Sequence, residues 1–179
     1  TPLRYAGGKS KAYGFISTYI PFWPKPKRII SPFIGGGSLE VRWANELDIE
    51  VIGYDVFDML VNFWEVLLSQ PQELSKELSK ITPDDKTYKE VKEILMSLDK
   101  TQDMLADWKT DSYKRKAIIS LNRLERASLY YFNHNTSYGP GYLGWGSSVY
   151  LQADKWKQMC KNINNFLCPT LSVQQADYR

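Results

Sequence analysis

The sequence predicts an α/β fold, and three observations carry that prediction. Two short apolar runs, residues 28–30 and 50–55, have the length and composition of buried strands. A glycine-rich turn follows the first run, and Asp55 ends the second. A helical pattern lies between them. Strand, glycine turn, helix and strand together make half of a doubly wound α/β unit.

The elements around the first strand follow from local patterns. Residues 11–20 predict a short helix that ends at Pro21, because proline removes a backbone donor and disrupts a helix interior. Residues 38–46 predict a second helix, because Leu39 and Trp43 recur at the spacing of helical turns.

Three apolar stripes after the second strand predict a helical block. The first runs over residues 57–68 and ends at Pro71, the second covers 88–98, and the third covers 113–131. No strand pattern interrupts them. We interpret this block as an insertion into the α/β core.

The last part of the chain returns to the core. Residues 133–150 contain glycines, a proline and interleaved aromatic residues without a helical period, which predicts a hairpin or an ordered surface loop. Residues 156–166 predict an amphipathic helix that Pro169 ends. A third strand then starts at Leu171 and finishes at residues 176–178.

Bulk composition limits the classes of protein. With 179 residues, 43% of them hydrophobic and 24% charged, we expect one packed domain carrying an insertion. The net charge of +3 permits a basic face without requiring one. We find no membrane-spanning run and no signal peptide. Two cysteines and one histidine do not make a disulfide framework or a zinc site, so we expect an intracellular, cytoplasmic protein without a metal.

The segment Gly7-Gly8-Lys9-Ser10 resembles the end of a phosphate-binding P-loop. That motif requires a glycine where Leu3 stands and a strand before it, and neither is present. A tight turn with an exposed lysine is the simpler interpretation.

The second glycine segment, residues 33–38, reads Phe-Ile-Gly-Gly-Gly-Ser. Amide groups at the start of the following helix favour an anionic or carboxylate-bearing ligand. Asp55 lies at the right distance along the chain to bind ribose hydroxyls. The GxGxxG spacing of dinucleotide sites is absent, which favours a smaller adenosyl cofactor. A plain strand-to-helix turn remains the alternative.

These segments together resemble the Dam-like, D12-class DNA adenine-N6 methyltransferases. The resemblance rests on the following residues, in order: Tyr5-Ala6-Gly7-Gly8-Lys9, Ser31-Pro32-Phe33-Ile34-Gly35-Gly36-Gly37, Tyr54-Asp55, Leu60-Val61-Asn62 and Ala176-Asp177-Tyr178. It implies a partial Rossmann-like methyltransferase core with a helical target-recognition insertion. Residues 1–55 would begin the core, 56–150 would be the insertion with its aromatic loop, and 151–179 would be the return helix and third strand.

The same resemblance implies S-adenosylmethionine as the cofactor. Tyr5 and Lys9 would lie against it, the glycine turn would flank its methionine part, and Asp55 would hold the ribose hydroxyls. Asp177 and Tyr178 would contact the adenine. The implied cofactor-binding set is Tyr5, Gly7, Gly8, Lys9, Phe33, Gly35, Gly36, Gly37, Ser38, Asp55, Asp177 and Tyr178.

Double-stranded DNA is the implied partner, with the target adenine flipped out of the duplex. Four cations could contact phosphates, and amides and rings of the loop could read base edges or fill the gap left by the flipped base. The predicted DNA-binding residues are Arg115, Lys116, Arg123, Arg126, Asn133, Asn135, Tyr138, Tyr142 and Trp145. The alternatives are solvated helix faces for the cations and a small core of the loop's own for Tyr142 and Trp145.

The family's catalytic Asp-Pro-Pro-Tyr segment is absent from the sequence. That segment holds both hydrogens of the adenine amine, and in the family it follows the third strand. We therefore expect that the chain as printed is part of a longer protein, has no catalytic residue of its own and is inactive. Two alternatives remain: a non-catalytic DNA-binding module or pseudoenzyme on the same scaffold, and a nicotinamide-dependent oxidoreductase.

Overall fold

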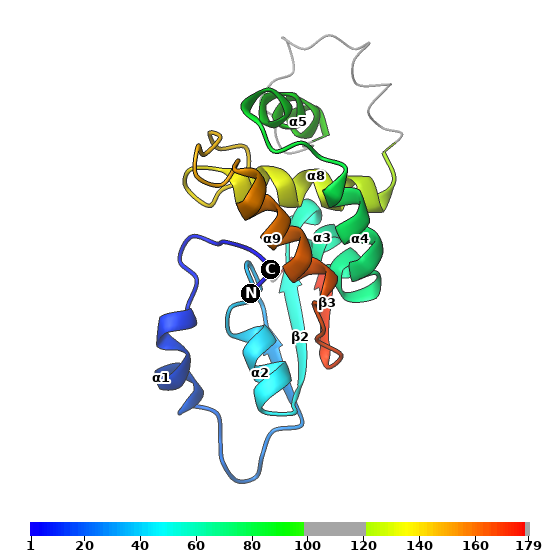
Figure 1. Cartoon of the computed structure of the whole chain (residues 1–179). Coiled ribbons are helices and arrows are strands. Elements are labelled where there is room, and N and C mark those ends of the chain that lie inside the picture. Colours follow the sequence, from blue (N-terminus) through cyan, green and yellow to red (C-terminus); the bar gives the residue numbers. More distant parts are fainter. Residues whose placement is uncertain (99–120, 178–179) are drawn as a thin grey trace.

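The computed structural model describes residues 1–98 and 121–177 (Figure 1). The described elements confirm a mixed α/β structure. In chain order they are η1 (Ser10–Ala12, a 3₁₀ turn), α1 (Tyr13–Ser17), β1 (Arg28–Ser31), α2 (Glu40–Glu46), β2 (Glu50–Asp55), α3 (Asp58–Ser69), α4 (Pro71–Ser79), α5 (Asp85–Leu98), α8 (Arg123–Thr136), α9 (Ala153–Asn164) and β3 (Leu171–Gln175).

The three strands form a small parallel sheet with β2 in the middle. Ile30 of β1 pairs with Ile52, and Asp55 at the end of β2 pairs with Gln175 of β3. The bounds predicted for the second strand are confirmed. Because all three strands run in the same direction, their carboxyl ends meet at one edge of the sheet.

Helix α3 lies at the centre of the core. It packs against β2 and β3 of the sheet and against helices α8 and α4. Its side chains Leu60, Phe63 and Trp64 are completely buried. The first helix of the segment predicted as an insertion therefore covers the sheet itself.

The remaining helices extend the core away from the sheet. Helix α4 packs against α9 and α8, and α5 packs against α8. Figure 1 shows α5 and α8 beyond the carboxyl end of β2, whereas α2 lies alongside that strand. Within residues 1–98 and 121–177, no helix combines the length and apolar character that a membrane crossing requires.

Pro71 has a second role besides the helix end that the sequence predicted. Helix α3 does end near Pro71, at Ser69, but Pro71 is also the first residue of α4. A proline at the first helical position loses no intrahelical hydrogen bond, and its fixed φ suits the helix. The helix predicted over 11–20 is also shorter, because only Tyr13–Ser17 is α-helical.

The loop predicted from Asn133 is wrong for its first four residues. Helix α8 continues to Thr136, and Asn133 and Asn135 are buried inside it. The helix tolerates these polar side chains because each carbonyl oxygen accepts a backbone N–H from another segment. The irregular stretch starts at Ser137, whose bridge to Gly146 closes an ordered loop.

Candidate functional site

Three predicted cofactor positions lie at the carboxyl edge of the sheet. The backbone N–H of Ile34, in the turn after β1, donates to the carbonyl of Tyr54 at 2.9 Å. On the other side of β2, the N–H of Ala176 donates to the carbonyl of Asp55 at 3.1 Å. The exposed Asp177 is the next residue after Ala176. The edge thus brings together Gly35, Asp55 and Asp177.

The carboxylate of Asp55 is fixed by two backbone donors. Its Oδ2 accepts the N–H of Gly35 at 3.2 Å, and its Oδ1 accepts the N–H of Phe57 at 3.1 Å. A carboxylate offers about four acceptor positions. Asp55 therefore locks the glycine turn to the end of β2 and keeps acceptor capacity for a further donor.

Tight packing explains two of the three consecutive glycines. Gly37 has a φ of 64°, and a Cβ there would lie 2.6 Å from Cζ2 of Trp64. A Cβ on Gly36 would lie 2.9 Å from Cγ of Tyr5. Gly35 also has a positive φ, 47°. The turn needs glycine for its own conformation and for the approach of Tyr5 and Trp64.

The amino-terminal segment folds back onto the start of α2. The N–H of Gly8 donates to the carbonyl of Tyr5 at 3.2 Å, and the N–H of Lys9 donates to Oγ of Ser38 at 2.8 Å. The exposed ammonium of Lys9 donates to the carbonyl of Gly7 at 2.6 Å. These contacts form a tight turn in which the side chain of Lys9 is exposed.

Two further residues of the implied cofactor set, Phe33 and Tyr178, remain to be placed. The side chain of Phe33 is 65% exposed, one residue before the turn enters the core. Tyr178 lies outside the described residues.

Sequence reasoning missed the aromatic stack beneath Tyr5. The ring of Tyr5 stacks on His134 at 5.3 Å between centroids, and His134 stacks on Tyr130 at 5.5 Å. Nε2 of His134 lies 2.7 Å from the carbonyl oxygen of Arg4 and donates a hydrogen bond to it, which orients the ring. Burial lowers the pKa of His134. A single histidine in a 179-residue chain was the available signal.

Burial also affects Tyr5. The pKa of the Tyr5 hydroxyl is raised, mainly by burial and to a lesser extent by the negative charge of Asp55. Tyr5 therefore stays neutral at the edge of the sheet.

The predicted phosphate-binding cations on α8 form ion pairs with carboxylates of this chain. Arg123 pairs with Glu65, and its Nε donates to Oδ1 of Asn62 at 3.3 Å. Arg126 lies 3.5 Å from the carboxylate of Asp58. These contacts join α8 to α3, so both cations serve helix packing in this structure. Arg115 and Lys116 lie outside the described residues.

The predicted base-contacting side chains fall into three groups. Asn133 and Asn135 are 0% and 1% exposed, so the structure removes them from the surface as direct DNA contacts. Tyr142 packs against Phe57 and Tyr130. The two remaining rings project from the loop, since Tyr138 is 79% and Trp145 82% exposed.

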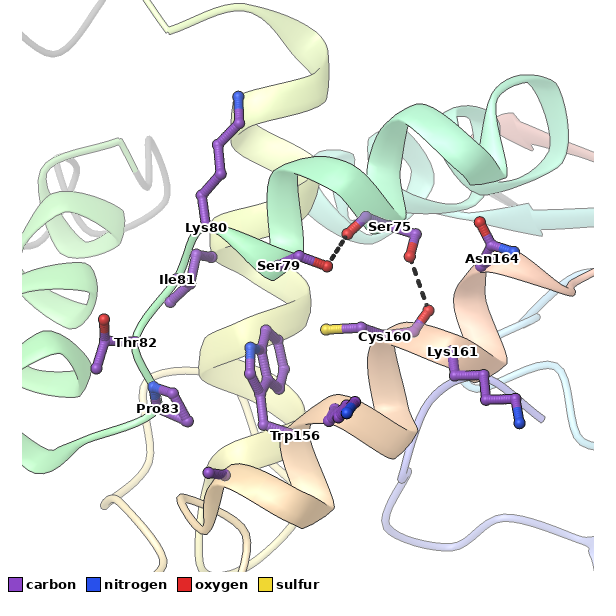
Figure 2. A pocket seen from close by; sticks show the side chains of 12 residues that line it. Ser75, Ser79, Lys80, Ile81, Thr82, Pro83, Trp156, Cys160, Lys161 and Asn164 are labelled. Atoms are coloured by element: carbon purple, nitrogen blue, oxygen red, sulfur yellow. Dashed lines mark hydrogen bonds between the residues drawn. The ribbon is translucent and has the colours of Figure 1, made fainter.

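A separate cavity of about 610 Å³ lies between α4 and α9 (Figure 2). Its polar groups join the two helices: Oγ of Ser75 donates to the carbonyl of Cys160 at 2.9 Å, and Nε1 of Trp156 donates to the carbonyl of Leu78 at 3.2 Å. Burial raises the pKa of Cys160 to about 11, so its thiol is protonated at neutral pH. This cavity contains none of the predicted site residues.

The described residues hold no cluster of three or more histidine, cysteine, aspartate or glutamate side chains suited to a metal ion.

Comparison with known proteins identifies the family. A search of curated proteins found no match. The family model for the D12 class N6 adenine-specific DNA methyltransferases matches residues 5–178, which is nearly the whole chain. The chain therefore belongs to the D12 class of N6 adenine-specific DNA methyltransferases.

Proposed function

We propose that the carboxyl edge of the sheet binds S-adenosylmethionine, and that the chain supplies the cofactor-binding and DNA-contacting parts of an adenine-N6 methyltransferase. Family membership supports methyl transfer to DNA adenine, and enzymes of this kind generally use that cofactor. The observation that carries the proposal is the position of Asp55. Its fixed carboxylate ends the central strand beside the glycine turn, where open α/β sheets bind their ligands.

The residues at this edge fit an adenosyl group. Asp55 has acceptor positions beyond the two that its backbone donors use, and the two hydroxyls of a ribose are matching donors. Tyr5 offers a neutral ring beside Gly35, and it is 38% exposed. Asp177 is exposed at the same edge and can accept from an adenine amine.

Chemically, the described residues bind and orient rather than transfer. When bound, S-adenosylmethionine supplies an electrophilic methyl group. The adenine amine needs acceptors that hold its hydrogens and direct its lone pair, and no Asp-Pro-Pro-Tyr segment is present in the sequence to supply them. We therefore expect this 179-residue chain to bind the cofactor without methylating DNA.

The partner in this proposal is double-stranded DNA, with the target adenine flipped out of the stack. The loop over residues 137–146 is the described segment best suited to meet it. Its exposed rings, Tyr138 and Trp145, can stack on bases, and such contacts contribute about 1–3 kcal/mol each. A non-catalytic DNA-binding module would use the same loop, but it would not need the carboxylate of Asp55.

Calorimetric titration with S-adenosylmethionine tests the proposal at Asp55. The Asp55→Asn variant keeps one acceptor oxygen but loses the charge, so we expect affinity to fall about 10- to 100-fold, as the loss of one or two charged hydrogen bonds implies. Asp48→Asn is the matched control. Asp48 lies just before β2, at the opposite edge of the sheet. Asp48→Asn removes the same charge as Asp55→Asn and should leave the affinity for S-adenosylmethionine unchanged.

Two results would contradict the proposal. One is equal affinity in wild type and Asp55→Asn, and the other is an equal loss in Asp48→Asn. Thermal unfolding of all three proteins checks that the fold is retained.

A further inference from the structure

The amino-terminal segment lies between the aromatic loop and the glycine turn. Arg4 makes the contacts with the end of α8 and the loop. Its backbone N–H donates to Oδ1 of Asn135 at 2.8 Å, and its Nη1 donates to the carbonyls of Asn135 at 2.7 Å and Ser137 at 3.1 Å. These carbonyls belong to the end of α8 and the start of the loop, where helix groups lack intrahelical partners. A cation at this end is also favoured by the helix dipole.

The guanidinium of Arg4 has a second contact beyond the loop. Its Cζ lies 3.3 Å from the centroid of the Tyr150 ring, which follows the loop in the chain. One side chain thus contacts the first residue of the loop that carries the exposed rings and a residue that follows it.

The next residue, Tyr5, holds the turn side. Its side chain occupies the space beside Gly35 and Gly36 that a Cβ on either would need. Its ring stacks on His134, whose Nε2 donates to the carbonyl of Arg4 at 2.7 Å. The contacts of Arg4 with the loop and of Tyr5 with the turn are therefore one peptide unit apart.

The loop itself is organised around Ser137. The hydroxyl of Ser137 accepts the N–H of Gly141 at 3.1 Å, and the N–H of Tyr138 donates to the carbonyl of Trp145 at 2.7 Å. The Ser137 carbonyl that Arg4 binds is thus at the base of the loop.

We propose that Arg4 is a positioning residue that ties the loop over 137–146 to the glycine turn over 35–37, so that the two segments are ordered together. Its significance rests on the proposed function, in which the loop meets DNA and the turn meets the cofactor. Ordering either segment then lowers the entropy loss on ordering the other, which gives reciprocal, positive coupling between the two ligands.

Hydrogen exchange measured by mass spectrometry tests this in the ligand-free protein. In Arg4→Gln we expect exchange to accelerate about tenfold in both segments, residues 137–147 and 33–38, as the loss of one charged hydrogen bond implies. Exchange in β2 and α3 should stay unchanged, whereas a general loss of stability would accelerate exchange everywhere.

Arg42→Gln is the matched control. Arg42 also lies over a tyrosine ring, 3.5 Å from the centroid of Tyr13, and pairs with Glu46 at 2.8 Å, but it touches neither segment. It should leave exchange in both segments at the wild-type rate. Arg4→Lys keeps the charge without the planar fork, so it should give the same pattern to a smaller extent if Arg4→Gln does not fold.

A second measurement adds S-adenosylmethionine. In wild type the cofactor should slow exchange in the loop, and in Arg4→Gln it should slow exchange in the turn only. The inference is overturned if Arg4→Gln accelerates exchange in the loop but not in the turn, or if the bound cofactor leaves the wild-type loop unchanged. Absence of cofactor binding by calorimetry would instead contradict the proposed function, while the ligand-free comparison would still decide the role of Arg4.

Discussion

The glycine turn after β1 and the stretch over residues 133–136 at the end of α8 both have the composition of surface turns, yet Gly36, Gly37 and both asparagines are buried. In the turn, the side chains of Tyr5 and Trp64 pack closely against the glycines, and the N–H of Gly35 donates to Asp55. In α8, Asn133 and Asn135 are buried, and their amides hold other segments in place. The difference teaches that a polar residue marks a surface only when no neighbouring segment satisfies its hydrogen bonds.

The two regions also differ in how they limit the fold. The turn is restricted by backbone conformation and close packing, whereas the end of α8 is restricted by hydrogen bonds to segments far away in sequence. Substitutions in the two regions should therefore lower the free energy of unfolding for different reasons and by different amounts.

The largest effect should come from the turn, at Gly37. Gly37→Ala places a Cβ 2.6 Å from the buried ring of Trp64 in a left-handed conformation, so we expect a loss of about 3 kcal/mol in unfolding free energy. Gly14→Ala is the control, because nothing lies within 4 Å of its Cβ in helix α1. Denaturant unfolding measures both. A Gly37→Ala protein as stable as Gly14→Ala would show that the turn is not restricted by packing.

A smaller effect should come from α8, at Asn135. Asn135→Ala removes the acceptor for the N–H of Arg4 and the donor to the carbonyl of Pro2, so we expect about 2 kcal/mol of destabilisation. Trp145→Ala, in the exposed loop, should keep unfolding free energy within about 0.5 kcal/mol of wild type. Trp145→Ala should instead weaken binding of the protein to a mixed-sequence DNA duplex, measured by fluorescence titration. The contrast fails if Asn135→Ala is neutral for stability or Trp145→Ala is neutral for DNA.

The smallest effect should be the pH dependence due to His134. Burial lowers its pKa in the folded state, so the unfolded chain binds more protons below its ordinary pKa of about 6.5, and stability falls as pH decreases through that value. Between pH 7.5 and 6 we expect a loss of up to about 1 kcal/mol. His134→Gln can still donate to the Arg4 carbonyl but does not titrate. Denaturation at both pH values should show that this variant lacks the loss, and an unchanged loss would assign it to other groups.

Local sequence predicted the sheet edge well. The second strand, the glycine turn and the terminal aspartate were identified because strand hydrophobicity and glycine conformation act over a few residues. The end of a helix at Pro71 was predicted correctly, but the helix α4 that begins there was not, because proline is unfavourable inside a helix and favourable at its first position.

The candidate site was predicted in part. The proximity of Gly35, Asp55 and Asp177 follows from parallel strands whose order places their carboxyl ends together. Arg123 and Arg126 were predicted to meet phosphates, but their partners on α3 are about 60 residues away in sequence, and no local pattern reveals such a pairing. The contacts of Arg4 with α8 were missed for the same reason.

By itself, the sequence determined the class of fold, the family and the residues proposed to bind a cofactor, because strand runs, positive-φ glycines and a strand-terminal carboxylate are constrained locally. Only the tertiary structure decided which polar side chains are at the surface, which cations are neutralised, and that Arg4 and Tyr5 lie between the loop and the turn. These outcomes depend on contacts between segments distant in sequence, whose energies are set when the core packs and the buried hydrogen bonds find their partners.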